Sequence, residues 1–316
     1  MKRENKMSFF DKEAVCLQNF ENSVEDRGPF WHVCTPGKLS EIIFTEPEDY
    51  RFAVSNMAIS AAETEVRVIT DQIMSNHIHG LLQGSLVRCR SFMEVYSYRL
   101  GKYLARRGRY VNLKEFRCDS PIPVTDYKMA RNEIVYINRN GYVADYRYTP
   151  FSYPWGSGSL YFNPYAKAVE GVPYADIPFL EKRSLTFRRV FDMPAGYKVR
   201  NGMILPSSYC DYRLGESLFS SAHQYFSMLS KNFESYSEES RRIGDSTPLV
   251  DDEVYSVVRM LSVRDYDIRQ PSLLPPDAKL EIARKLHFDY RADNEQIRRI
   301  LRLSPSDLDA LFPRAK

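Results

Sequence analysis

Two histidines separated by one residue are the first candidates for chemistry in this sequence. His77 and His79 flank Ile78 in a short run whose alternation is typical of a β-strand. Residues i and i+2 of a strand point to the same face, so both imidazoles can bind one divalent ion while Ile78 faces the opposite side. Such an ion would polarise a phosphate oxygen during a displacement at phosphorus. A half-exposed strand that carries two histidines and no ion is the alternative interpretation.

A tyrosine and an asparagine form a second candidate pair. Tyr136 and Asn140 lie four residues apart near the end of a predicted helix, and this spacing places them on one face of it. A tyrosine there can attack phosphorus, and Asn140 can supply an oxygen ligand to the same ion. Because a phenol has a pKa near ~10, a nearby cation or base would have to assist it. With 22 tyrosines in the chain, Tyr136 taken alone is more simply interpreted as a packed or surface residue.

The remaining histidines and the cysteines show no comparable spacing. His32, His223 and His287 have no neighbouring ligand at metal-binding spacing, and we interpret them as structural residues. The cysteines contain no Cys-x-x-Cys pair, which argues against a thiolate zinc site, and their odd number argues against a disulfide framework. We therefore expect ordinary reduced thiols. The five are Cys16, Cys34, Cys89, Cys118 and Cys210.

A basic segment with interleaved aromatic residues lies between the two candidate pairs. From Ser85 to Arg117 it has nine Lys or Arg residues against two Glu residues, in a chain whose net charge is only +3. Basic groups neutralise phosphates and aromatic rings stack on unpaired bases, so this mixture favours contact with single-stranded nucleic acid. A solvated helix face with aromatic core contacts is the alternative. The candidate DNA-binding residues are Arg99, Lys102, Arg106, Arg107 and Arg109.

The order of predicted elements indicates the fold that would position these residues. In chain order they are a strand at 30–35, a helix from about residue 45, strands at 65–74 and 77–82, a helix at 92–107, a strand-like stretch within 111–125 and a helix at 126–140. Ser75 and Asn76 form a turn between two strands, and Gly141 is placed to end the last helix. This order predicts an α+β fold, a ferredoxin-like antiparallel sheet with helices on one face.

Changes of composition divide the chain into four regions. Residues 1–27 are polar and mixed, and we expect a loosely packed lead-in before a catalytic domain at 28–160. The Tyr, Pro, Gly and Ser content that follows indicates an extended and helical connecting region at 161–250. Residues 251–316 are predicted to form a small helical unit whose spacing fits a helix-turn-helix that contacts duplex DNA. Plain three-helix packing or a dimerisation module fits the same spacing.

Length and hydropathy set broader limits. The chain has 316 residues, 43% of them hydrophobic, which is enough to bury at least one full core. The N-terminus is charged and is not followed by an apolar run of signal-peptide length. No stretch approaches the ~18 uncharged apolar residues that a membrane span needs. We therefore expect a cytoplasmic protein without a membrane partner.

Three motifs together resemble those of a known family. Met74 to Leu82 (MSNHIHGLL) is similar to the Met-Pro-Asn-His-hydrophobe-His-hydrophobe-Leu-Leu signature of single-tyrosine HUH transposases, including the REP-associated tyrosine transposases. Tyr136 to Asn140 (YINRN) resembles the family's Tyr-Ile-His-x-Asn-Pro. Tyr153 to Ser157 (YPWGS) resembles its Tyr-x-Trp-Ser-Ser. The motifs occur in the family's order, and the likeness covers about residues 28–160.

The resemblance implies an HUH fold and a metal-dependent enzyme that nicks and joins DNA. His77, His79 and Asn140 would bind Mg²⁺ or Mn²⁺. Tyr136 would be the nucleophile that forms a 5′-phosphotyrosine link and frees a 3′-hydroxyl. The implied partner is single-stranded or hairpin DNA, handled by a monomer or a homodimer in DNA transposition or in the processing of repeat hairpins.

Several positions depart from the family pattern. They are Ser75 in place of proline, Gly80 in place of a hydrophobe, Asn138 in place of a common histidine, and Gly141-Tyr142 in place of Pro-Val. The change at Asn138 removes a residue that could assist the nucleophile, and Tyr142 is an alternative nucleophile. Two other hypotheses therefore stand beside the transposase-like enzyme. One is a catalytically silent DNA-binding protein with the same fold. The other is a metal-dependent hydrolase of small phosphoesters, which leaves the basic helix and Tyr136 unexplained.

Overall fold

A computed structural model describes residues 8–312 of the chain apart from short gaps. The gaps are residues 36–41, 110, 112, 114–115, 119, 144–147, 150, 187–192, 231–250, 289, 291 and 293. The chain divides into two compact units. The first comprises residues 1–141 and 150–231, and the second comprises residues 142–149 and 232–316.

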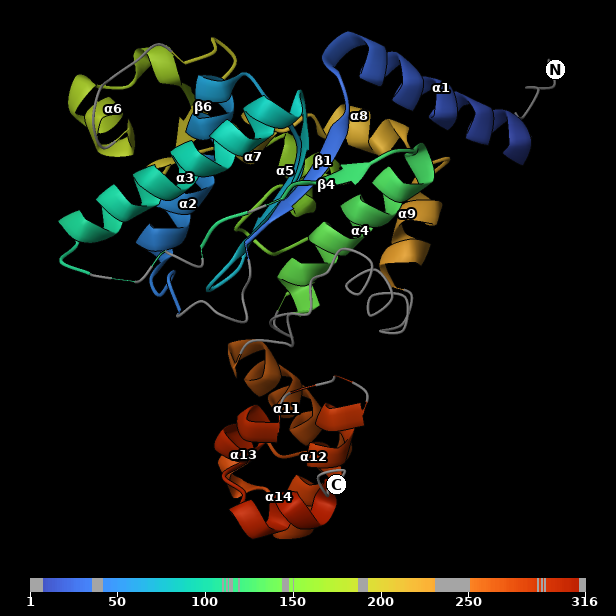
Figure 1. Ribbon diagram of the computed structural model, residues 1–316, viewed down its shortest axis with the longest axis vertical. Helices are drawn as coiled ribbons and strands as arrows, with labels where there is room; N and C mark the ends of the chain where they lie inside the picture. Colours follow the sequence, from blue (N-terminus) through green and yellow to red (C-terminus); the bar gives the residue numbers. More distant parts are fainter. Residues whose placement is uncertain are drawn as a thin grey trace. The chain divides into compact units, whose positions relative to one another are not determined.

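A four-stranded antiparallel sheet is the centre of the first unit (Figure 1). Its strands lie side by side in the order β2-β3-β1-β4. In chain order, their bounds are β1 (Phe30–Cys34), β2 (Arg67–Ile73), β3 (Ile78–Gln83) and β4 (Ile122–Val124). The long helices are α2 (Pro47–Thr64) between β1 and β2, α3 (Leu86–Arg106) between β3 and β4, and α4 (Tyr127–Val143) after β4. The prediction of an α+β fold with an antiparallel sheet is confirmed.

Different helices cover the two faces of this sheet. Val33, on one face, belongs to the hydrophobic core that α2 and α3 share with the sheet. On the other face, Phe30 stacks on Phe20 of helix α1 (Phe9–Arg27), and His32 contacts Glu133 of α4. The prediction of helices on one face only is therefore wrong. The second face carries side chains that also have to be covered, and α1 and α4 cover them.

Helix α1 occupies the region in which the composition indicates a loosely packed lead-in. Ser8 accepts a hydrogen bond from the Asp11 backbone, and the Asp11 carboxylate accepts one from the Ser8 backbone, which is a complete capping box. Cys16 and Phe20 are buried, whereas most of the helix is exposed. The expectation for residues 8–27 is wrong because a helix that buries only a narrow stripe is mostly polar in composition.

Helix α4 continues past the residue that was expected to end it. It runs through Gly141 to Val143, so the prediction of a stop at Gly141 is wrong. A Cβ atom at Gly141 would lie 2.5 Å from Cδ1 of Tyr153. Glycine is therefore needed here for the close approach of the Tyr153 ring to the helix, and not for a change of backbone direction.

The segment around Trp155 covers the outer edge of β2. The Ile73 backbone N–H donates to the Trp155 carbonyl at 2.9 Å, and the Ser157 N–H donates to the Asp71 carbonyl at 3.0 Å. Trp155 also stacks on Tyr50, with ring centroids 5.0 Å apart. The backbone groups of this edge strand are thereby paired within the chain, which removes a surface for unwanted strand pairing. The segment therefore belongs to the first unit and closes one edge of its sheet.

The described part of residues 161–230 belongs to the first unit and consists of short elements. The helices are α5 (Pro164–Lys167), α6 (Phe179–Thr186), α7 (Pro206–Tyr209), α8 (Tyr212–Ser217) and α9 (Ala222–Leu229), with 3-10 helices at Gly158–Leu160 and Tyr174–Asp176. Strands β5 (Val172–Pro173), β6 (Lys198–Arg200) and β7 (Met203–Ile204) form a small antiparallel sheet.

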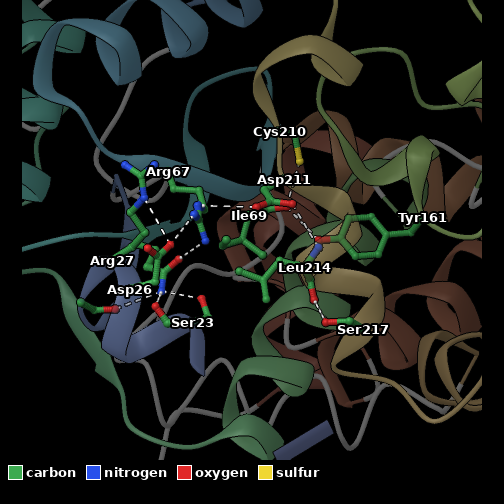
Figure 2. A network of polar contacts seen from close by, with 12 residues as sticks. Ser23, Asp26, Arg27, Arg67, Ile69, Tyr161, Cys210, Asp211, Leu214 and Ser217 are labelled. Carbon is green, nitrogen blue, oxygen red and sulfur yellow. Dashed lines mark hydrogen bonds and ion pairs between the residues drawn. The ribbon is translucent and has the colours of Figure 1, made fainter. Parts of the chain in front are cut away.

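A polar network joins β2 to this region and to α1 (Figure 2). The Tyr161 hydroxyl donates to the Ile69 carbonyl at 2.8 Å. Arg67 reaches Asp26 of α1 at 3.0 Å and Asp211, the N-cap of α8, at 3.5 Å. These contacts hold β2 between elements that are far apart in the sequence.

The second unit contains its own helical core. Its helices are α11 (Asp251–Tyr266), α12 (Pro276–Phe288), α13 (Asn294–Leu301) and α14 (Pro305–Leu311), with a 3-10 helix at Pro271–Leu273. His287 stacks on Phe312 with ring centroids 4.0 Å apart, so this histidine has the structural role expected of it. Across the described residues of both units, we find no helix with the length and apolar character needed to cross a membrane.

Candidate active site

The hairpin β2–β3 places the two candidate histidines next to each other. His77 directly precedes β3, and His79 lies within it. Their rings are nearly perpendicular, with centroids 4.9 Å apart. Both side chains are buried, on the face of the sheet that α4 covers. The local reasoning that placed them on one face of a strand agrees with this arrangement.

Helix α4 brings the candidate nucleophile to the same place. The Tyr136 ring centroid lies 5.5 Å from that of His79 and 5.9 Å from that of His32. The exposed fraction of Tyr136 is 3%, compared with 3% for His77, 1% for His79 and 4% for Asn140. Tyrosine and histidines that come from separate elements are thus gathered in one buried cluster.

Two local hydrogen bonds leave suitable atoms for a metal ion. His77 Nδ1 lies 2.7 Å from Asn76 Oδ1, so Nδ1 carries the proton and the ring lone pair is on Nε2. The side-chain nitrogen of Asn140 donates to the Tyr136 carbonyl at 3.1 Å, which leaves the amide oxygen as its potential ligand atom. The assignment of His77, His79 and Asn140 as ligands of one ion stays a prediction.

A third histidine, interpreted from the sequence as a structural residue, also belongs to the cluster. His32 Nε2 lies 3.2 Å from His79 Nδ1, and His32 Nδ1 lies 2.5 Å from the Glu133 carboxylate. His32 and Glu133 are both completely buried. Local spacing does not predict this chain of groups, because it depends on the pairing of β1 with β3 and on the position of α4.

A cysteine completes a second set of potential ligands. Within the described residues, ligand atoms of His32, Cys34 and His79 all lie within 4.8 Å of one another. The signal for it was present in the sequence, because His32 and Cys34 are i and i+2 of a strand, as His77 and His79 are. The reasoning that led to one pair applies equally to the other.

Burial determines the protonation of the central histidine. The pKa of His79 lies well below its usual value, first because burial disfavours the charged ring and then because His77 and His32 would repel a second positive charge. His79 is therefore neutral at physiological pH, and one of its two nitrogens carries a lone pair in place of a proton. This is the form in which imidazole binds a metal ion.

Two of the five candidate DNA-binding residues, Arg99 in helix α3 and Arg109 just after it, form hydrogen bonds with other elements of the protein. Arg99 is buried and donates to the Asn56 side chain at 2.8 Å and to the Thr186 carbonyl at 2.9 Å. Arg109 is half-buried and donates to Asp49 at 2.6 Å. These contacts do not support the assignment of Arg99 and Arg109 to DNA binding.

The other three candidates for DNA contact are exposed. Arg107 forms an ion pair with Glu46 at the surface. Lys102 lies over the Tyr98 ring with its nitrogen 5.4 Å from the centroid, and Arg106 is exposed on the same helix. Lys102 with Tyr98 retains the combination of a cation and an aromatic face that suits an unpaired base.

Two departures from the family pattern have structural explanations. Asn138, which replaces a histidine, accepts a hydrogen bond from Thr70 of β2 and donates one to the Tyr225 hydroxyl at 3.1 Å. It therefore joins α4 to the sheet and to α9. Gly80 pairs with Val33, and a Cβ atom added to it would lie 3.3 Å from Val33 Cγ2. The glycine thus faces the α2 and α3 core, on the side of β3 opposite His79.

The side chain of Tyr142, the alternative nucleophile, lies outside the described residues.

Comparison of the chain with protein-family models, with curated proteins and with solved structures finds no match. The interpretation of the site therefore depends on its residues and their geometry.

Proposed function

We propose that this protein is a single-tyrosine enzyme of the HUH transposase type that nicks and joins single-stranded or hairpin DNA. One observation carries the proposal. The Tyr136 ring lies 5.5 Å from the ring of His79, although the two residues come from separate elements. A nucleophile next to potential metal ligands is what phosphodiester transfer through a tyrosine requires.

The topology supports the same proposal. Strands and helices follow the order β1-α2-β2-β3-α3-β4, and the strands lie in the sheet as β2-β3-β1-β4. This is the connectivity of a ferredoxin-like split βαβ arrangement. Because folds host many activities, the topology adds to the argument from the site and does not replace it.

The proposed reaction conserves the phosphodiester bond energy. The Tyr136 oxygen attacks phosphorus and loses its proton to a base, while the bond from phosphorus to the 3′ oxygen breaks. The 3′ oxygen takes up a proton, and the 5′ phosphate stays on the tyrosine. Attack of a 3′-hydroxyl on that link reverses the step and releases Tyr136, so strands can be rejoined without ATP.

His77, His79 and Asn140 would hold the divalent ion. Two imidazoles and an amide oxygen leave coordination positions for water and phosphate, which suits Mg²⁺ or Mn²⁺. When bound, such an ion supplies electrostatic stabilisation to a phosphate oxygen. The hydrogen bond from His77 to Asn76 fixes the ring so that Nε2 can serve as the ligand atom.

A catalytically silent DNA-binding protein is the second candidate. Burial favours it: Tyr136 and its three candidate partners are each exposed by 4% or less. A phosphate must reach the tyrosine oxygen for any transfer to occur. A binding protein could retain the fold and use exposed groups such as Lys102 and Arg106 without that access.

Covalent trapping distinguishes the two candidates. The full chain is incubated with Mn²⁺ and pools of 5′- or 3′-labelled hairpin DNA, and the products are separated on denaturing gels. We expect a protein–DNA adduct in the wild type, and a loss of at least about a thousand-fold in Tyr136→Phe. His77→Ala should also abolish the adduct. Tyr165→Phe, which changes an exposed tyrosine of α5, is the matched control and should react as the wild type does.

The opposite outcomes are equally informative. DNA binding without any adduct across the pools would favour the silent binding protein. Adducts that persist in Tyr136→Phe would reject this tyrosine as the nucleophile and leave Tyr142 as the next residue to test.

A further inference from the structure

A group of three potential metal ligands faces α4 from strands β1 and β3. Cys34 and His79 are direct partners across the two strands, so their side chains share one face of the sheet. His32 lies two residues before Cys34 on β1 and points to the same face. The pairing of the strands is therefore sufficient to bring one thiol and two imidazoles together.

The spacing of these groups suits a tetrahedral ion. Bonds of about 2.0–2.1 Å to nitrogen and about 2.3 Å to sulfur put two ligand atoms of a zinc ion roughly 3.3–3.6 Å apart. His32 Nε2 and His79 Nδ1 are separated by 3.2 Å. All three ligand atoms, including the Cys34 sulfur, lie within 4.8 Å of one another. The sulfur thus has to move by little more than about 1 Å to complete the site.

Glu133 orients one of the ligands. Its carboxylate lies 2.5 Å from His32 Nδ1, so this nitrogen carries the proton and donates it. The lone pair of His32 is then on Nε2, which faces His79. A carboxylate that fixes the tautomer of a histidine in this way is the usual outer partner of a metal-bound imidazole.

Charge gives a second argument for an ion. The Glu133 side chain is completely buried, and a buried carboxylate is costly unless opposite charge and hydrogen bonds accompany it. A divalent ion bound to a Cys34 thiolate and two neutral histidines has one net positive charge. Together with Glu133, the site would be electrically neutral.

We propose that His32, Cys34 and His79 bind a zinc ion, with Glu133 as the residue that positions His32. One thiolate and two imidazoles select zinc, or cobalt in its place, over Mg²⁺ and Mn²⁺, which prefer oxygen ligands. The fourth position of the ion is left for water or for a group of a substrate. Tyr136 lies next to it, because its ring neighbours those of both His32 and His79.

This site differs from the one in the proposed reaction and does not depend on it. The zinc ion would use His79 Nδ1, so Nε2 of the same ring would carry the proton and could not bind a second ion. Zinc would therefore occupy His79 in place of Mg²⁺ or Mn²⁺. A metal-binding experiment without DNA tests this inference, and the trapping experiment with DNA tests the reaction.

Cobalt substitution provides the direct test. The full chain is stripped with a chelator and titrated with Co²⁺, and its absorption is followed before Zn²⁺ is added as a competitor. We expect one equivalent of Co²⁺ to give a thiolate-to-cobalt charge-transfer band, and Zn²⁺ to remove it. Cys34→Ser should lose the band, whereas Cys118→Ser, a half-buried control thiol, should retain it.

Two further variants test the histidines and the carboxylate. His32→Gln should weaken Co²⁺ binding at least tenfold, and Glu133→Gln should weaken it by roughly 10–100-fold. His77→Ala should keep the cobalt band, because His77 belongs to the other ligand set. Circular dichroism of each variant checks that the fold is retained.

Other results would overturn the inference. They are the absence of a band in the folded wild type, a band that survives Cys34→Ser, or a loss of the band in His77→Ala alone. Should Cys34→Ser fail to fold, alkylation of the wild type answers the same question. Zn²⁺ must then protect Cys34, but not Cys118, from iodoacetamide as measured by mass spectrometry, and equal labelling with and without Zn²⁺ would reject the site.

Discussion

The two faces of the central sheet are built from the same strands but differ in chemistry. The face toward α2 and α3 is formed mainly by apolar side chains such as Val33 and Leu82, which lie in the main hydrophobic core. The face toward α4 buries His32, His79 and Glu133, which contact one another through polar atoms. Alternation along a strand is sufficient to separate these two sets of side chains.

The difference indicates which face determines stability and which face is a candidate for chemistry. Apolar burial contributes favourable free energy at every position. Buried polar groups contribute little net stability and become costly when a partner is lost. A protein without a use for the polar face would lose little by replacing it with apolar residues, so its presence favours a functional role for the α4 face.

The largest stability effect is expected on the apolar face. Leu82→Ala removes a fully buried side chain and should lower the free energy of unfolding by about 2–5 kcal/mol. Urea denaturation measures this change. The Co²⁺ band of the folded variant should be unaltered, since Leu82 points away from α4. Loss of the band in a folded Leu82→Ala protein would contradict the separation of the two faces.

Asp71 is a buried carboxylate on the apolar face and makes stability depend on pH. It pairs with Gly80, accepts a hydrogen bond from the Tyr209 hydroxyl at 3.0 Å, and has a second oxygen without a hydrogen-bond partner among the described residues. Burial raises the pKa of Asp71 to about 6. The folded protein therefore holds this proton more tightly than the unfolded chain, and the advantage disappears as the pH rises through about 6.

The expected effect follows from that difference in pKa. The free energy of unfolding should fall by about 2 kcal/mol between pH ~4 and pH ~7 on account of Asp71. Asp71→Asn should remove this part of the pH dependence, and Glu48→Gln, a change at the surface, should leave it in place. Denaturant unfolding across the pH range measures it. An unchanged slope in Asp71→Asn would show that other groups are responsible.

Local patterns predicted the parts of the fold that depend on neighbouring residues. The strands on either side of Ser75 and Asn76, and the helix that carries Tyr136, follow from periodicity and turn residues. The proximity of His77 to His79 follows from the period of a strand. These features are properties of short segments, which is why they can be predicted from a single sequence.

The features that were missed depend on contacts between distant segments. His32 meets His79 only because β1 pairs with β3, and Glu133 reaches His32 only because α4 covers that face. Arg99 is buried and contacts Asn56 of α2, which the charge of its own helix does not reveal. Correct secondary structure was thus not sufficient to predict which distant residues these side chains contact.

A smaller effect on stability is expected at Gly141, where the sequence incorrectly predicted the end of α4. Gly141→Ala would place a Cβ atom 2.5 Å from the Tyr153 ring, so the ring or the helix must shift. Overpacking of this kind costs roughly 1–3 kcal/mol. Thermal unfolding measures the loss of stability. Gly108→Ala is not a suitable control, because the positive φ of 69° at Gly108 would itself strain an alanine. Gly101→Ala within α3 is suitable, since its nearest contact would be an ordinary 3.5 Å. Equal stability of the Gly141 and Gly101 variants would show that Tyr153 moves without cost.

The smallest effect concerns α1, the other helix on the polar face. Ser8→Ala removes the side chain that accepts the Asp11 N–H and should cost about 0.5–2 kcal/mol. Because the cap lies at the end of the helix remote from Phe20 and Phe30, we expect the first turn to fray while the contact with the sheet persists. Hydrogen exchange should therefore increase at residues 9–12 and remain unchanged in β1. Faster exchange in β1 would mean that α1 holds the polar face together as a cooperative unit, and that this face contributes more to stability than its polar groups suggest.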